Sequence, residues 1–300
     1  MDMMDNILYK YNNGNTTVTI YDDGTKIREY EDTPCVIFPE SIDLKITNSC
    51  NMNCAFCHES STKDGAHANI DKLKQTLNDL PAGIEIAIGG GNIFEYPDLI
   101  EFLTWCKYKG FICNITINQK HLKKNLSQLK YLIEEDLVKG IGVSINGNDF
   151  NSLKELKSKS KHVVYHLIAG IHKPDILDKL NKLGNCKVLI LGYKQFGRGI
   201  NYYSDEVIKN INEWKIKLPA YFGKFLIAFD NLALKQLDVK SMLPEKVWDS
   251  CFMGEDFTFT MYVDGVKEQY APTSSSSNRT SFSEMTLLDY FVKHKNKISF

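Results

Sequence analysis

The sequence predicts an α/β protein built around a parallel sheet, and three observations support this prediction. Apolar, strand-like runs recur roughly every 25 residues through the middle of the chain, about one strand–helix unit each. The runs begin near Ile42, Ile84, Phe111, Gly140, His162 and Lys187. The segments between them place apolar residues at helical spacing. Six units fall short of the eight of a full barrel, so we expect a (β/α)6 partial TIM-type barrel.

The helices are justified by the position of their apolar residues. Leu99, Phe102 and Cys106 share one face of the segment 97–110, and Gly110 suits the end of a helix. The predicted helices cover residues 70–80, 97–110, 124–137 and 173–184.

Two elements flank the barrel, which we place at residues 41–221. Residues 1–40 are predicted to form an N-terminal β-hairpin extension that turns at Asp22-Asp23-Gly24. The alternation of strands and helices weakens from residue 222. There, GKFLIAFDNLAL predicts one more strand, FTFTMYVDGVKEQY a second hairpin, and the last residues a helix. We therefore expect 222–300 to form a C-terminal α+β cap over the barrel mouth.

The composition indicates an ordinary soluble chain. Its 300 residues carry a net charge of −1, which gives no electrostatic footprint for nucleic acid or an anionic membrane. The start of the chain lacks a signal-peptide pattern, and no apolar run reaches the roughly 18 residues of a membrane span. We expect a cytoplasmic protein whose eight cysteines serve as metal ligands, catalytic groups or core packing.

Three cysteines form the most informative motif. Cys50, Cys54 and Cys57 lie in TNSCNMNCAFCHES, a C-x3-C-x2-C spacing directly after the first predicted strand. An iron–sulfur cluster with one open iron fits three thiolates on a tight loop. Two alternatives are a structural zinc with His58 as the fourth ligand and haem attachment through CAFCH.

The motif and its position resemble the radical S-adenosylmethionine (radical SAM) superfamily, and Phe56 matches the aromatic residue that this family places before its third cysteine. The resemblance covers about residues 41–200. It implies a [4Fe–4S] cluster held by Cys50, Cys54 and Cys57, with S-adenosylmethionine chelating the fourth iron. Reductive cleavage would yield a 5′-deoxyadenosyl radical that abstracts a hydrogen atom from substrate. An electron donor such as flavodoxin or ferredoxin is implied as a partner.

The resemblance also assigns S-adenosylmethionine contacts to the ends of the later strands. The family usually carries a GGE-like motif after its second strand, and this chain has GGGN, so Asn92, backbone carbonyls or Glu95 would substitute for the acidic residue. The predicted contacts are Phe56, Gly89, Gly90, Gly91, Asn92, Asn118, Ser144, Asn146, Leu191 and Gly192. For the asparagines, capping of the next helix is an equal alternative.

Several other polar residues are weaker candidates. Lys194 and Arg198 could bind a substrate anion, although a solvated loop is the simpler expectation. His166 lies within a predicted strand and could contact substrate, and His58 and His67 flank the cysteine loop.

The C-terminal segment CFMGEDFTFTMYVDG resembles the start of the auxiliary-cluster (SPASM-type) extension of peptide-modifying radical SAM enzymes. No cysteine follows Cys251, so this hairpin is degenerate and a second cluster is not expected. Cys251 could donate a hydrogen atom to a substrate radical, and burial as a small apolar residue is the alternative. Core packing is expected for Cys106, Cys113 and Cys186, and Cys35 shows no ligand spacing.

The predicted function is that of a radical SAM enzyme with an unknown substrate. Its alternatives are a peptide-modifying maturase or epimerase, an enzyme acting on a nucleoside or small metabolite, and a zinc-stabilised binding module.

Overall fold

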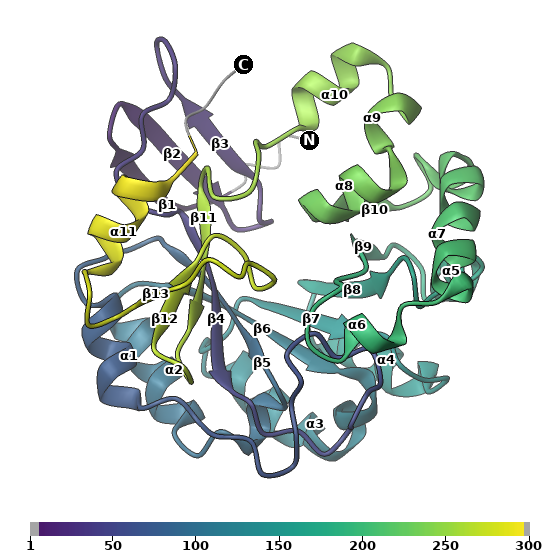
Figure 1. Ribbon diagram of the computed structural model, residues 1–300, viewed down its shortest axis with the longest axis horizontal. Helices are drawn as coiled ribbons and strands as arrows, with labels where there is room; N and C mark the ends of the chain where they lie inside the picture. Colours follow the sequence, from purple (N-terminus) through teal and green to yellow (C-terminus); the bar gives the residue numbers. More distant parts are fainter. Residues whose placement is uncertain (1–5, 297–300) are drawn as a thin grey trace.

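The computed structural model describes residues 6–296. Its centre is a ten-stranded sheet with the order β10-β9-β8-β7-β6-β5-β4-β11-β12-β13 (Figure 1). Every pair from β4 to β10 is parallel, and β11 pairs in parallel with the other edge of β4. These strands are β4 (Ser41–Thr47), β5 (Glu85–Gly90), β6 (Ile112–Asn118), β7 (Gly140–Ser144), β8 (Val163–Ile168), β9 (Lys187–Leu191), β10 (Leu226–Phe229), β11 (Thr260–Asp264), β12 (Gln269–Ala271) and β13 (Thr280–Ser281). The predicted α/β class is confirmed.

Helices connect the parallel strands and cover the outer face of the sheet. They are α1 (Ile70–Leu77), α2 (Leu99–Tyr108), α3 (Gln119–Glu134), α4 (Phe150–Lys159), α5 (Ile176–Asn181), α6 (Gly199–Tyr202), α7 (Asp205–Lys217), α8 (Asn231–Leu237), α9 (Val239–Met242), α10 (Glu245–Cys251) and α11 (Leu287–His294), with 3-10 turns η1 (Ile93–Glu95) and η2 (Leu218–Tyr221). Helix α3 begins earlier than the predicted residue 124, because Asn118 caps it by accepting from the amide of Lys120. Within the described residues, no helix is both long and apolar enough to cross a membrane.

The two faces of β4 carry different side chains. Ile42, Leu44 and Ile46 are at most 1% exposed and belong to the main apolar core. Successive residues of a strand point to opposite faces, so Asp43 and Lys45 face the inner side of the sheet. The helices therefore bury one face, and the inner face is left for polar chemistry.

The sheet curls strongly. Lys194, which follows β9, donates from Nζ to Oγ of Ser274 in the β12–β13 loop at 2.8 Å. The guanidinium of Arg279 also lies 5.9 Å from the ring centre of Phe196. Strands β9 and β12 are seven steps apart in the sheet, which in a flat sheet would be roughly 34 Å. The contacts thus require a curved, barrel-like sheet, as expected for a partial barrel.

The N-terminal extension is larger than the predicted hairpin. Strands β2 (Thr16–Tyr21) and β3 (Lys26–Glu29) form that hairpin, and β1 (Ile7–Asn13) adds a third antiparallel strand. Val18 and Ile20 pack against Ile112 at the start of β6. Lys187, at the start of β9, donates to the carbonyl of Asp23 at 3.2 Å. This small sheet therefore covers the amino-terminal end of the curled sheet.

The segment after residue 222, predicted to cap the mouth, contributes strands to the main sheet. It supplies β10 to one side of the parallel sheet and β11 to the other, so the same segment extends both edges. The predicted hairpin at Asp264-Gly265 is β11–β12, and the amide of Gly265 donates to the carbonyl of Lys45 at 2.9 Å. The boundaries 1–40, 41–221 and 222–300 remain our proposed division of the chain.

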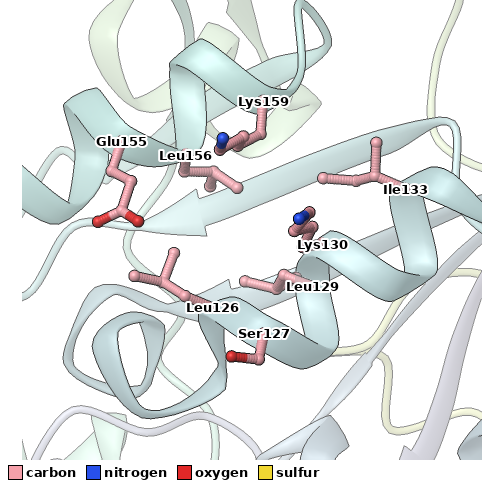
Figure 2. A pocket seen from close by; sticks show the side chains of 8 residues that line it. All are labelled: Leu126, Ser127, Leu129, Lys130, Ile133, Glu155, Leu156 and Lys159. Carbon is pink, nitrogen blue, oxygen red and sulfur yellow. The ribbon is translucent and has the colours of Figure 1, made fainter.

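The outer helices leave a shallow groove of about 110 Å³ between α3 and α4. Figure 2 shows Leu126 and Leu129 on α3 facing Leu156 on α4, with Lys130 and Lys159 also lining the groove. A larger hollow of about 530 Å³ lies between α1 and the segment from β12 to α11. Neither hollow is lined by the three cysteines, which lie at the carboxyl end of the strands.

We expect Arg28 to be needed for attaching the N-terminal sheet. Its Nη2 lies 2.7 Å from Oε2 of Glu40, a carboxylate with no exposed surface, and its guanidinium lies 4.1 Å from the ring centre of Phe259. Arg28→Met should lower the free energy of unfolding by about 2 to 3 kcal/mol, because a buried carboxylate loses its main partner. Urea denaturation measures this change, with the exposed Lys10→Met as the control. A loss equal to that of the control would contradict the expectation.

Candidate functional site

The three cysteines lie on a loop that leaves the carboxyl end of β4. The amide of Cys50 donates to the carbonyl of Thr62 at 2.7 Å, which closes the loop, and Asn53 adopts a left-handed φ of 44° between the first two cysteines. Cys50, Cys54 and Cys57 are all free thiols and only partly buried. The loop therefore presents three sulfur atoms at the rim where the parallel strands end.

Neighbouring strand ends hold this loop. Asn146, which follows β7, donates from Nδ2 toward Sγ of Cys54 at 3.6 Å. His121 on α3 contacts Oδ1 of Asn51 through Nε2 at 3.1 Å. Burial lowers the pKa of His121, so its imidazole is neutral at pH 7. Of the predicted strand-end residues, Asn146 thus lies directly at the cysteine loop.

The glycine run after β5 packs against the start of the same loop. A Cβ at Gly90, whose φ is +119°, would lie 2.3 Å from the carbonyl oxygen of Thr47, and one at Gly91 would lie 2.2 Å from that of Ser49. Gly89 has no atom within 4 Å of such a Cβ, so it borders open space. Only Gly89 leaves room for a ligand, while Gly90 and Gly91 serve close backbone packing.

The remaining predicted contacts divide between structural roles and the inner face. The side chain of Asn92 accepts from the amide of Phe94 at 3.4 Å and donates to the carboxylate of Glu95 at 3.1 Å. The two residues expected to replace the family's acidic residue therefore bond to each other. The Asn118 side chain caps α3, which was the alternative to a ligand contact at this position. The amide of Gly192 donates to Oδ1 of Asp230 at 2.8 Å. Ser144 and Leu191 end their strands at the rim.

The cysteine loop fits a cluster better than a single ion. Among residues 6–296, no three His, Cys, Asp or Glu side chains gather closely enough to hold one metal ion. Around a tetrahedral zinc the sulfurs would lie about 3.8 Å apart, given a Zn–S bond of about 2.3 Å, whereas a cluster binds each thiolate to a different iron. His58, the proposed fourth zinc ligand, lies 3.4 Å from Glu59 instead.

Burial raises the pKa of the Cys50 and Cys54 thiols. Half-buried thiols with raised pKa values stay protonated when no metal is bound. Metal coordination reverses this preference, because a metal ion binds the thiolate and displaces the proton. The donor set, the free state of the three thiols and their shared loop therefore suit an iron–sulfur cluster.

The inner face carries carboxylates that the sequence did not single out. Water reaches Asp43, yet enough protein surrounds its carboxylate that burial raises its pKa, with Lys194 opposing and Asp230 and Asp256 reinforcing the shift. These residues come from β4, from the N-cap of α8 directly after β10, and from the loops after β9 and before β11. The curl of the sheet brings these charged residues together, and no local sequence pattern predicts their proximity.

His166 lies on the same inner face. A Cβ at Gly142 on β7 would lie 2.4 Å from the His166 ring, so the imidazole covers that glycine. Burial lowers the pKa of His166 to about 4. The residue is therefore a neutral imidazole at physiological pH.

A buried ionic group joins the cysteine loop to the C-terminal hairpin. Nζ of Lys45 lies 2.7 Å from Glu59 and 3.5 Å from Asp264, and the hydroxyl of Tyr262 donates to Glu59 at 3.0 Å. Burial alone would raise the pKa of Glu59, but its hydrogen bond with His58 and the Lys45 ammonium hold that pKa well below its usual range. The carboxylate of Glu59, two residues after Cys57, is thus held by Lys45 on β4 and by Tyr262 of the β11–β12 hairpin.

Arg198 differs from its expected role on a solvated loop. It is half-buried, and Nε donates to the carbonyl of Cys54 at 2.9 Å. Lys194 is bonded to Ser274 rather than free, and Nδ1 of His67 lies 2.8 Å from Oγ1 of Thr47. Arg198 and Lys194 are therefore half-buried structural partners, whereas His67 is exposed although it contacts Thr47.

Cys251 is not buried, which corrects its packing alternative. It ends α10 with an exposed side chain. Figure 1 places α10 at the top of the molecule and the segment between β4 and α1 at the bottom, so the structure does not bring Cys251 to the cysteine loop. Cys106, Cys113 and Cys186 are buried, as expected, and Cys35 is exposed.

Comparison with known proteins agrees with this geometry. Residues 44–173 match the family model of the radical SAM superfamily. This segment is a radical SAM domain. Over 75 residues, the chain is also 35% identical to a probable GTP 3′,8-cyclase of Methanothermobacter thermautotrophicus, a match that covers 24% of each protein. The radical SAM family implies a [4Fe–4S] cluster and S-adenosylmethionine, and the three cysteines of the domain are the ligands that fit.

Solved structures share the fold of the radical SAM domain and its extensions. SuiB of Streptococcus suis bound to its precursor peptide SuiA superposes with a TM-score of 0.62 at 12% identity, covering 86% of this chain and 65% of SuiB. SuiB bound to S-adenosylmethionine gives a TM-score of 0.61 at 13% identity, covering 86% and 66%. At these identities the likeness shows the fold alone, and the chain spans less than two thirds of either relative.

Replacing His166 should change how stability depends on pH. The folded-state pKa of about 4 lies below the ordinary value of 6.5, so folding disfavours protonation and stability is lost as pH falls from about 6.5 toward 4. Between pH 7 and pH 5, His166→Gln should lose about 2 kcal/mol less free energy of unfolding than the wild type. Urea denaturation at both pH values tests this, with the exposed His294→Gln as the control. The same loss in wild type and His166→Gln would refute it.

Proposed function

We propose that this chain is a radical SAM enzyme whose substrate is a peptide. The observation that carries the first part is the loop with Cys50, Cys54 and Cys57, which leaves the carboxyl end of β4 within a radical SAM domain. Active sites of barrel-like parallel sheets lie at that end of the strands.

The roles of this chain's own residues follow from their positions. The three thiolates would hold the cluster, and Asn146 would donate a hydrogen bond to the Cys54 sulfur. Gly89 would leave room for S-adenosylmethionine beside the loop. When bound, the two groups supply one-electron reductive cleavage of S-adenosylmethionine, which starts hydrogen-atom abstraction. The electron would come from a flavodoxin- or ferredoxin-type donor.

The substrate would lie against the inner face of the curled sheet. Asp43 is without an ion-pair or hydrogen-bond partner within residues 6–296, and water reaches it. Asp230 already accepts from two backbone amides, those of Gly192 and Ala233. Asp43 is therefore the carboxylate available to orient a polar or cationic group of the substrate.

A peptide is favoured over a small metabolite by the extent of the fold likeness. The likeness to peptide-bound SuiB includes 86% of this chain, far beyond the radical SAM domain itself. The likeness to the probable GTP 3′,8-cyclase covers 24% of the chain. The C-terminal hairpin β11–β12 resembles the start of a SPASM-type extension but has no cysteine after Cys251, so one cluster is proposed.

Loss of one cysteine ligand should abolish the activity. Anaerobic reconstitution of the wild type should give a brown protein with about four iron atoms and four sulfides per chain. Cys54→Ala should lose most of this iron and all reductive cleavage of S-adenosylmethionine, because the two remaining thiolates are not sufficient to hold the cluster. Iron analysis and detection of 5′-deoxyadenosine measure both effects, with the exposed Cys35→Ala as the control. Retained 5′-deoxyadenosine formation by Cys54→Ala, or one colourless zinc in the wild type, would overturn the assignment.

The peptide substrate is testable by co-expression. Short peptides encoded beside the gene should change mass when produced with the wild-type enzyme and stay unchanged with Cys54→Ala. Mass spectrometry of each peptide reads this out. If no peptide changes while a nucleoside or another small metabolite is consumed with 5′-deoxyadenosine formation, the alternative substrate class is correct.

A further inference from the structure

Arg198, in the segment between β9 and α6, binds the cysteine loop. Its side chain donates from Nε to the carbonyl of Cys54 and from Nη1 to the carbonyl of Ser61, each at 2.9 Å. Its backbone amide lies 3.1 Å from both the carbonyl of Cys57 and Oγ of Ser60. Arg198 therefore contacts the second half of the cysteine loop, from Cys54 to Ser61.

The backbone around Arg198 is built for this approach. Gly197 has a φ of +55°, and a Cβ there would lie 2.3 Å from the carbonyl oxygen of His58. A Cβ at Gly199 would lie 2.4 Å from the carbonyl oxygen of Lys194. Beyond them, the rings of Tyr202 and Phe56 meet edge to face with centroids 5.8 Å apart. The segment 197–202 and the cysteine loop thus form one packed unit.

The charge of Arg198 is not neutralised by an acidic side chain. Within residues 6–296, no carboxylate forms an ion pair with it. The guanidinium is half-buried, which weakens solvent screening, and its hydrogen bond to the Cys54 carbonyl holds it against the cysteine loop. A fixed positive charge therefore lies beside the loop that carries the proposed cluster ligands.

We propose that Arg198 is a positioning residue that fixes the cysteine loop and raises the reduction potential of the cluster. This inference rests on the proposed function. Reduction adds one electron and makes the cluster more negative, with no bond formed or broken. A neighbouring cation stabilises the reduced form more than the oxidised form, and the potentials of such clusters depend on net charge and hydrogen bonding around them.

Two substitutions separate the charge from the hydrogen bonds. Arg198→Met removes both, whereas Arg198→Lys keeps the charge but cannot reproduce the planar fork that reaches Cys54 and Ser61 together. Lys161→Gln, an exposed residue elsewhere on the surface, is the control for removing one positive charge. All proteins are reconstituted anaerobically and compared without S-adenosylmethionine or substrate, so the readouts do not depend on turnover.

The first readout is the midpoint potential of the cluster, measured by mediated dithionite titration with electron paramagnetic resonance detection. Arg198→Met should lower the ratio of reduced to oxidised cluster about tenfold at a fixed potential. This corresponds to a decrease of about 59 mV in the midpoint potential. Arg198→Lys and Lys161→Gln should stay close to the wild type. A wild-type potential for a fully loaded Arg198→Met protein would overturn the electrostatic part.

The second readout is the rate at which a chelator removes iron from the oxidised protein. Both Arg198 variants should lose iron several-fold faster than the wild type and the control. If Arg198→Met cannot be loaded, Arg198→Lys decides the positioning role, because iron loss at the wild-type rate would overturn it. If the wild-type chain itself binds no cluster, the proposed function fails. If it binds one and the variants behave like it, only the role of Arg198 fails.

Discussion

The curl of the parallel sheet is the constraint on which the rest of the structure depends. It places the loop after β9 beside both the cysteine loop and the β12–β13 loop, through Arg198 and Lys194 respectively. In a flat sheet these segments would lie tens of ångströms apart. The carboxylates of the inner face gather for the same reason, since β4 and β10 approach each other only when the sheet bends.

The two ends of this curled sheet have opposite characters. The N-terminal sheet covers the amino-terminal end with apolar contacts around Val18, Ile20 and Ile112. The carboxyl end carries the cysteine loop, which is held by ionic and backbone hydrogen bonds from Lys45–Glu59 on one side and from Arg198 on the other. Apolar burial together with the Arg28–Glu40 ion pair thus holds one end, while directional polar contacts fix the geometry of the other.

Local patterns were sufficient to predict the strands of the parallel sheet, the helices α1, α2, α3, α5 and α11, and the three cysteines, because each depends on periodicity or spacing within a few residues. The strand β1 was missed although it pairs with the neighbouring β2. The partners of Arg198 and the group Lys45–Glu59–Asp264 were missed because their contacts join segments between about 14 and 220 residues apart and depend on how the sheet curls. Asn118 and Asn92 show the reverse case, in which an expected ligand contact is a local cap.

The free edge of β10 has a consequence for what can enter this molecule. Within the described part of the chain, β10 pairs only with β9, so no ladder of backbone hydrogen bonds closes the curl. The seam is bridged by side-chain contacts such as Lys194–Ser274, each contributing about 1 kcal/mol. Opening this seam would therefore cost less free energy than opening a closed barrel, in which a pair of strands would have to separate. Such an opening would let the proposed peptide substrate enter from the side with both of its ends outside.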